Sequence, residues 1–108
     1  MDEGIQQLSA PELKAMMEGA EAFEFIDVRT PQERAVAMIE GSRLLDQVTH
    51  DYLLGLDRST PIVFQCHHGI RSQAAAEYFR GHGFRKLYNL SGGIDAWSEL
   101  VDRTVPRY

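Results

Sequence analysis

The part of the sequence best suited to chemistry lies between an apolar run and a helix-like segment. The stretch VFQCHHGIRS places the only cysteine, Cys66, at the end of the apolar run, and Gly69 and Arg71 follow it. A short loop at this point can curl so that its backbone N–H groups point inward. Together with the positive end of the following helix, these groups form a site for an anion. The same field favours the thiolate over the thiol, so the spacing predicts that Cys66 is a nucleophile.

Two residues of the loop strengthen this prediction. Gly69 allows the positive φ that a tight loop often needs. Arg71 brings a permanent charge and a planar set of donors for an oxyanion substrate. The alternative is that Cys66 is a small buried apolar side chain, which is the more common role of an isolated cysteine at the end of a strand. That alternative leaves the glycine and the arginine unexplained, so we favour the catalytic interpretation.

His67 and His68 raise the question of a metal site. Adjacent side chains are expected to diverge, and no carboxylate or thiol stands at a spacing that would complete a ligand set. We therefore expect no bound metal. Both histidines are expected to line the mouth of the loop, where a histidine carries partial positive charge near neutral pH.

Length, charge and cysteine content restrict the class of protein. A chain of 108 residues suits one compact domain, which we place at residues 1–108. Its formal net charge of −5 and the absence of a Lys/Arg cluster argue against nucleic-acid binding. No apolar run approaches the roughly 20 residues needed to cross a bilayer, and the first residues, MDEGIQQLSA, are acidic where a signal peptide is basic. A single cysteine excludes an internal disulfide and fits a reducing compartment, so we expect a cytoplasmic protein with no membrane partner.

Strand-like and helix-like segments alternate along the chain. The apolar runs that indicate strands are Ala22–Val28, Pro61–Cys66 and Lys86–Leu90. Capping signals, glycine stops and apolar periodicity indicate helices from Ser9 to Gly19, from Pro31 onward, over Asp51–Leu56, from Ser72 to Arg80 or His82, and over Ile94–Leu100. Strands separated by helices predict a largely parallel sheet with helices on both faces. Ligands of such sheets bind beyond the carboxyl ends of the strands, which is where Cys66 stands.

Three separated stretches resemble the rhodanese-type sulfurtransferases. CHHGIRS is similar to the active-site loop of that family, Cys-x-x-Gly-x-Arg/Thr followed by a helix. DVRTPQERAVAMIEGS, residues 27–42, resembles the family's Asp-Val-Arg segment that ends in Gly-His-Ile-x-Gly-Ala, and GFRKLYNLSGGIDAW, residues 83–97, resembles its C-terminal Gly-Gly-x-x-x-Trp segment. The chain departs from the family at Ala37 and Met38, where Gly-His is usual, and at Glu40, where proline is common. These departures concern a local turn and leave the cysteine loop intact.

The resemblance implies a fold and a reaction. The fold is a three-layer rhodanese-like α/β domain of about five mostly parallel strands with helices on both faces. In the reaction, Cys66 attacks the outer sulfur of thiosulfate or a similar donor anion, expels sulfite and becomes a persulfide. A thiophilic acceptor, which is cyanide, a small thiol or a protein thiol, then takes the sulfur, and no metal or organic cofactor is needed. The donor and the persulfide would be bound by the loop residues His67, His68, Gly69, Ile70, Arg71 and Ser72.

The same resemblance assigns supporting roles. Arg71 is the best candidate for holding the donor anion. Asp27 and Arg29 are expected to brace the loop by ion pairing, although Arg29 would also add positive charge near the site. Gly92 and Gly93 are expected to form a tight turn.

Three alternatives remain open at this point. Cysteine-dependent phosphatases, some of which share this fold, place arginine six residues after the cysteine, whereas Arg71 follows Cys66 by five, and the smaller loop favours sulfur over phosphate. Partner-binding modules of the family commonly lack the cysteine that this chain keeps. The third alternative is a sulfur-relay carrier that serves a protein acceptor. The ending Val-Pro-Arg-Tyr resembles that of rhodanese domains found alone or attached to sulfur-carrier activating enzymes.

Overall fold

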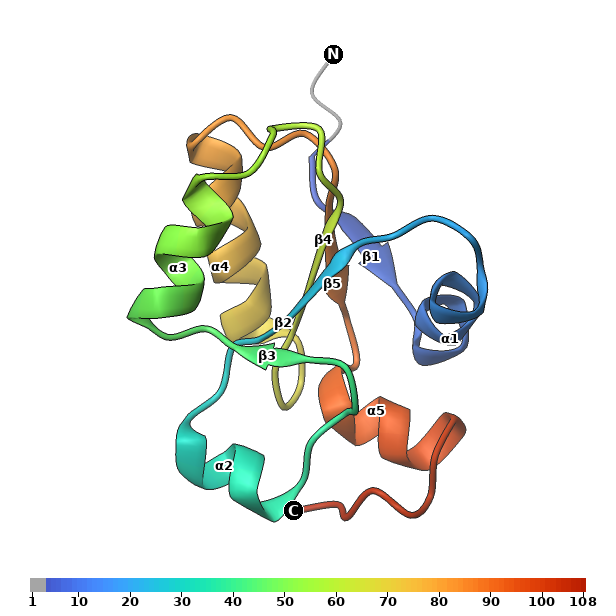
Figure 1. Cartoon of the computed structure of the whole chain (residues 1–108). Helices are drawn as coiled ribbons and strands as arrows, with labels where there is room; N and C mark the ends of the chain where they lie inside the picture. Colours follow the sequence, from blue (N-terminus) through green and yellow to red (C-terminus); the bar gives the residue numbers. More distant parts are fainter. Residues whose placement is uncertain (1–3) are drawn as a thin grey trace.

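A five-stranded parallel sheet forms the centre of the molecule (Figure 1). The computed structural model describes residues 4–108, so the acidic residues Asp2 and Glu3 lie outside the described part. The strands are β1 (Gln6–Leu8), β2 (Glu24–Asp27), β3 (Arg43–Leu44), β4 (Ile62–Gln65) and β5 (Leu87–Leu90), in the order β1-β5-β4-β2-β3 with every pairing parallel. The helices are α1 (Ala10–Glu18), α2 (Pro31–Val36), α3 (Gln47–Leu54), α4 (Ile70–Gly81) and α5 (Gly93–Leu100). This architecture confirms the expected α/β fold of about five mostly parallel strands.

Helices cover both faces of the sheet, and each face has its own hydrophobic core (Figure 1). Phe25 and Val63 are neighbours in the β2–β4 register and belong to the core beneath α1 and α5. Ile26 and Phe64, one residue further along each strand, belong to the core beneath α3 and α4. Because both faces are buried, successive residues in the middle of these strands are apolar rather than alternating with polar ones, as in parallel strands between two helical layers.

Capping side chains determine where the first three helices begin. Ser9 and Thr30 each form a capping box with the glutamate three residues later, which confirms the starts predicted for α1 and α2. The prediction of a helix over Asp51–Leu56 was wrong in its boundaries. The side chain of Asp46 accepts a hydrogen bond from the backbone of Thr49, so α3 begins at Gln47 and ends at Leu54.

The cysteine loop is shorter than the sequence pattern indicated. Helix α4 begins at Ile70, two residues before the predicted start at Ser72, because Gly69 serves as its N-cap with φ +96°. This helix is the longest of the fold, with 12 residues. Within residues 4–108, no helix combines the length and apolar character needed to cross a lipid bilayer.

The two edge strands were not identified from the residue pattern. β1 has three residues and β3 has two, and the polar side chains of Gln6, Gln7 and Arg43 are exposed on them. Such short polar segments carry no apolar run, so they become strands only by pairing with β5 and β2.

The turn after α2 accommodates the departure from the family's Gly-His pair. Ala37 caps the C-terminus of α2 with φ −158° and ψ 140°, an extended backbone that any residue adopts. Its N–H donates to the carbonyl of Glu33 at 3.1 Å, and Met38 is exposed. Glycine is therefore not required at position 37.

Candidate active site

Cys66 lies directly after β4, at the carboxyl end of the sheet, and it is 1% exposed. The backbone N–H of Gly69 donates a hydrogen bond to Sγ at 3.1 Å, and the Ser72 hydroxyl lies 3.3 Å from the same atom. The loop therefore curls around the sulfur and directs polar hydrogens toward it, as the spacing of the sequence predicts.

These donors control the ionisation of the thiol. Burial raises the pKa of Cys66, whereas hydrogen bonds from the side chain and backbone of Ser72 and from the backbone of Gly69 and His68 lower it. The hydrogen bonds outweigh the burial, so the pKa of the thiol lies below its ordinary value. A lowered pKa increases the thiolate fraction near neutral pH, which is what a nucleophile needs.

Two glycines allow the loop to pack closely against its neighbours. Gly69 has φ +96°, as expected, and a Cβ there would collide with the carbonyl of Ser91. Gly93, at the start of α5, has φ +61°, and a Cβ there would collide with the carbonyls of Cys66 and His67. The close approach lets the backbone N–H of Ile94 donate to the Cys66 carbonyl at 2.8 Å. This hydrogen bond attaches the N-terminus of α5 to the loop.

Asn89 on β5 orients the Ser72 hydroxyl. Its Nδ2 donates to the carbonyl of Gly69 and to Oε1 of Gln7, both at 3.0 Å, which turns its Oδ1 toward Ser72 Oγ at 2.5 Å. A hydroxyl has one proton, so Ser72 donates either to Asn89 or to the sulfur of Cys66. The hydroxyl can therefore turn to the sulfur when the sulfur carries negative charge.

Arg71, the permanent cation of the loop, is paired with a carboxylate. Its two terminal nitrogens donate to the two carboxylate oxygens of Glu33 on α2, at 2.6 and 2.9 Å. These hydrogen bonds hold the pKa of Glu33 well below its usual range. The positive charge of Arg71 is thus balanced within the protein.

The expected ion pair between Asp27 and Arg29 is present and buried. Arg29 donates to both carboxylate oxygens of Asp27 at 2.8 Å, and Arg34, which was not predicted to take part, adds a third hydrogen bond at 3.0 Å. Arg29 also donates to the carbonyl of Ala37 at 2.7 Å and to the hydroxyl of Tyr108 at 3.0 Å. This network ties the end of β2 to α2 and to the C-terminal segment.

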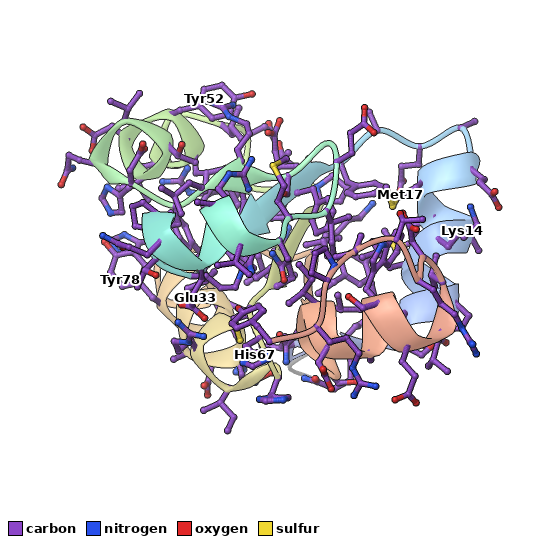
Figure 2. All side chains as sticks on the ribbon, turned by 90° about the horizontal axis from the view of Figure 1, so that it is seen from below. Lys14, Met17, Glu33, Tyr52, His67 and Tyr78 are labelled. Atoms are coloured by element: carbon purple, nitrogen blue, oxygen red, sulfur yellow. The ribbon has the colours of Figure 1, made fainter. Side chains whose placement is uncertain are left out.

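The C-terminal segment folds back over the mouth of the loop. The ring of Tyr108 stacks on that of His67, with centroids 4.0 Å apart and planes 11° apart, and its hydroxyl donates to Glu33 Oε2 at 2.8 Å. Figure 2 views this end of the sheet, where Glu33 and His67 lie close together. The ring of Tyr108 thus contacts the loop at His67, and its hydroxyl contacts Glu33, which pairs with Arg71.

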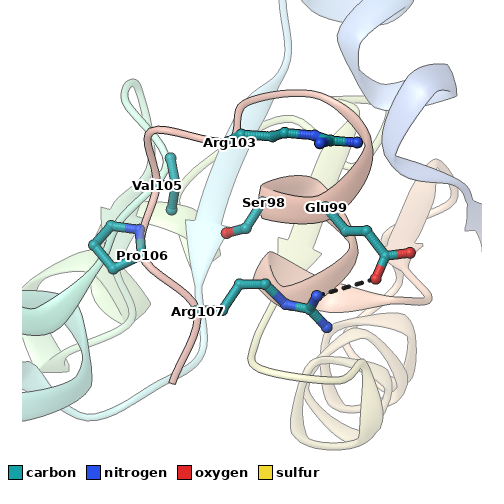
Figure 3. Close-up of a pocket in the computed structure, with 6 residues that line it drawn as sticks. All are labelled: Ser98, Glu99, Arg103, Val105, Pro106 and Arg107. Carbon is teal, nitrogen blue, oxygen red and sulfur yellow. Dashed lines mark ion pairs between the residues drawn. The ribbon is translucent and has the colours of Figure 1, made fainter.

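Arg107 fastens this segment to α5. Its guanidinium donates to the carboxylate of Asp95 at 2.9 and 3.0 Å and pairs with Glu99 at 3.2 Å. Figure 3 shows the pocket between α5 and the segment, with the ion pair between Arg107 and Glu99 at its edge. The ion pairs of Arg107 therefore help to hold Tyr108 over the loop.

The two histidines of the loop lie differently from what was expected. Their rings stack with centroids 3.9 Å apart instead of diverging, and Asp95 brings a carboxylate whose ligand atoms lie within 4.8 Å of theirs. Asp95 comes from α5, far along the chain, so sequence spacing gave no sign of it. Its carboxylate is already paired with Arg107, which supplies the neighbouring positive charge.

Besides Arg34 and Asp95, the residues of the site that were missed from the sequence include Glu33, Asn89 and Tyr108. The sequence pattern placed Glu33 only in the helix that begins at Pro31, and Asn89 only in a strand. The Val-Pro-Arg-Tyr ending was the one signal that drew attention to Tyr108.

Comparisons with known proteins identify the family and the fold of the chain. The family model described as the rhodanese-like domain matches residues 9–100. The protein named thiosulfate sulfurtransferase GlpE from Ectopseudomonas mendocina is 42% identical over 73 residues, which are 67% of this chain and 67% of that protein. A protein of the same name from Pseudomonas aeruginosa is 35% identical over 101 residues, 93% of this chain and 90% of that protein. The crystal structure of a rhodanese-like domain protein from Staphylococcus aureus has a TM-score of 0.76 at 25% identity, covering 96% of this chain and 99% of that one.

Proposed function

Because the chain belongs to the rhodanese-like domain family, we propose that it is a thiosulfate sulfurtransferase that carries sulfur on Cys66. Its relatives over most of its length are named for that activity, and the chain keeps a single cysteine in the family's loop position. The observation that carries the proposal is the Cys66 sulfur, which lies within hydrogen-bonding distance of the Gly69 amide and the Ser72 hydroxyl. A sulfur held in this way is prepared to bear negative charge.

In the first half of the reaction, the Cys66 thiolate attacks the outer sulfur of thiosulfate. A new S–S bond forms to Cys66, the S–S bond of the donor breaks, and sulfite leaves with the bonding electron pair. The product is a persulfide whose outer sulfur carries the negative charge. The amides of residues 67–72 stabilise this anion together with the positive end of α4.

In the second half, an acceptor takes the outer sulfur and restores the thiolate. Cyanide would leave as thiocyanate, and a thiol would leave as a persulfide. A protein thiol or a sulfur-carrier protein fits the same chemistry. Ile70, at the rim of the loop, is 81% exposed and offers an apolar contact to such a partner. A cytoplasmic location suits a reactive thiol of this kind.

The test is to incubate the protein with thiosulfate and measure its mass before and after cyanide. We expect one added sulfur, located on Cys66 and removed by cyanide. Cys66→Ser should abolish both the added sulfur and the thiosulfate:cyanide reaction while keeping the circular dichroism spectrum. Full turnover in Cys66→Ser would contradict the proposal, as would turnover of an aryl phosphate that depends on Cys66.

A further inference from the structure

We infer that Glu33 is a specificity-determining residue, because it competes with anionic donors for the guanidinium of Arg71. The inference rests on the proposed function for its substrate, and it concerns the Glu33–Arg71 ion pair rather than the sulfur chemistry. Arg71 is the only lysine or arginine among residues 66–72. A dianionic donor that approaches a thiolate needs this positive charge. In the structure, Glu33 already occupies one nitrogen-bearing edge of the guanidinium.

Hydrogen bonds from Thr30 and Tyr108 fix the orientation of the Glu33 carboxylate. Its Oε1 accepts hydrogen bonds from the backbone of Thr30 at 3.2 Å and from the Thr30 hydroxyl at 3.3 Å, and its Oε2 accepts one from Tyr108 at 2.8 Å. Arg29 in turn donates to the Tyr108 hydroxyl at 3.0 Å. The carboxylate therefore faces Arg71 with little freedom to turn away.

The pair is nevertheless open to exchange. The side chain of Arg71 is 45% exposed and that of Glu33 is 21% exposed, so water and donor ions reach them. Ion pairs in contact with water contribute little net free energy, which allows a donor oxyanion to replace the carboxylate. Each anionic donor must make this replacement, whereas an uncharged ligand need not. Glu33 thus weakens the binding of anionic donors selectively.

The test uses Glu33→Gln, because glutamine keeps the capping box at Thr30 and removes the charge. We expect kcat/KM for thiosulfate to rise about three- to tenfold, mainly through a lower KM, once Arg71 is released. The matched control is Glu77→Gln. Glu77 also lies on an element of the site, α4, and lines the groove beside Gly69, so its substitution removes the same charge at a nearby position.

A second measurement needs no sulfurtransferase activity. The rate of Cys66 alkylation by iodoacetate, which is anionic, is divided by the rate for iodoacetamide, which is neutral. This ratio should rise about three- to tenfold in Glu33→Gln, and it should return to the value of Arg71→Ala in the double variant Glu33→Gln/Arg71→Ala. A rise no larger than that of Glu77→Gln, or a rise that persists in the double variant, would overturn the inference. Loss of the thiosulfate reaction alone would instead count against the proposed function.

Discussion

The Ser72 hydroxyl lies 3.3 Å from the sulfur of Cys66, six residues earlier in the chain. The same hydroxyl lies 2.5 Å from Oδ1 of Asn89, a residue that is fixed by its bonds to Gln7 and Gly69. Ser72 therefore has a permanent neutral acceptor and a second acceptor whose charge changes during the reaction. This arrangement lets one buried side chain serve both the fold and the thiolate.

Replacing Ser72 by alanine should raise the pKa of Cys66. The hydrogen bond from the Ser72 hydroxyl lowers the pKa by favouring the thiolate, so its loss shifts the ionisation to higher pH, while the backbone hydrogen bond of residue 72 remains. We expect a smaller thiolate fraction near neutral pH, since a hydrogen bond to a charged group contributes about 1.5–3 kcal/mol and only the amide donors remain. The pH dependence of iodoacetamide alkylation measures the shift directly. Ser98→Ala, another buried serine, is the control and should leave the profile in place; an unchanged profile in Ser72→Ala would show that the amides alone set the pKa.

Gly69→Ala should destabilise the protein and slow the reaction together. The residue has a positive φ and its Cβ would meet the Ser91 carbonyl, so the loop must shift to accept it. The left-handed conformation alone costs roughly 1–2 kcal/mol for alanine, which corresponds to a decrease in Tm of at least about 4 °C in a domain of this size. Gly81→Ala is the matched control, because nothing lies within 4 Å of the position that its added methyl group would take. Equal Tm values for the two variants would contradict the role assigned to the loop geometry.

The sequence was informative where structure is set by neighbours in the chain. Capping boxes marked α1 and α2, and an unbroken apolar run marked β4, because both signals lie within a few residues. The tight loop after Cys66 was predictable for the same reason, although α4 begins two residues earlier than expected. β1 and β3 were not, since their strand conformation comes from pairing partners elsewhere in the chain.

The active-site residues that were missed share one property, which is distance along the chain. Glu33 stands 38 residues from Arg71, and Asn89 stands 17 residues from Ser72. The parallel sheet brings these residues together only because the carboxyl ends of its strands meet at one edge. The ion pair between Arg71 and Glu33 was not predicted, because no local pattern indicates a partner on another helix.

Arg71→Ala should lower kcat/KM for thiosulfate, and the size of the loss should depend on Glu33. In the parent protein, the donor must displace the Glu33 carboxylate from Arg71. This displacement offsets part of the binding free energy that the guanidinium contributes. We expect a loss of about tenfold in this background, with Arg71→Lys between it and the parent, because lysine keeps the charge and loses the planar donors. The same substitution in Glu33→Gln should cost more. Steady-state kinetics at several salt concentrations provide the check, since screening should reduce the difference between parent and Arg71→Ala. Parent-like kinetics in Arg71→Ala would leave donor binding to the loop amides.

Substitutions at Tyr108 should separate a steric role from an electrostatic one. The ring covers His67, and the hydroxyl orients Glu33, so the two parts of the side chain act on different properties of the site. Tyr108→Phe keeps the ring, and we expect an unchanged rate of Cys66 alkylation by iodoacetamide but a higher ratio of iodoacetate to iodoacetamide rates. Tyr108→Ala removes the cover as well, so alkylation by the neutral reagent should also accelerate, by about twofold or more if the ring limits access to the buried sulfur. Only the alanine variant uncovers His67. Equal rates of Cys66 alkylation by iodoacetamide in the two variants would therefore show that the Tyr108 ring does not restrict access of the reagent to Cys66.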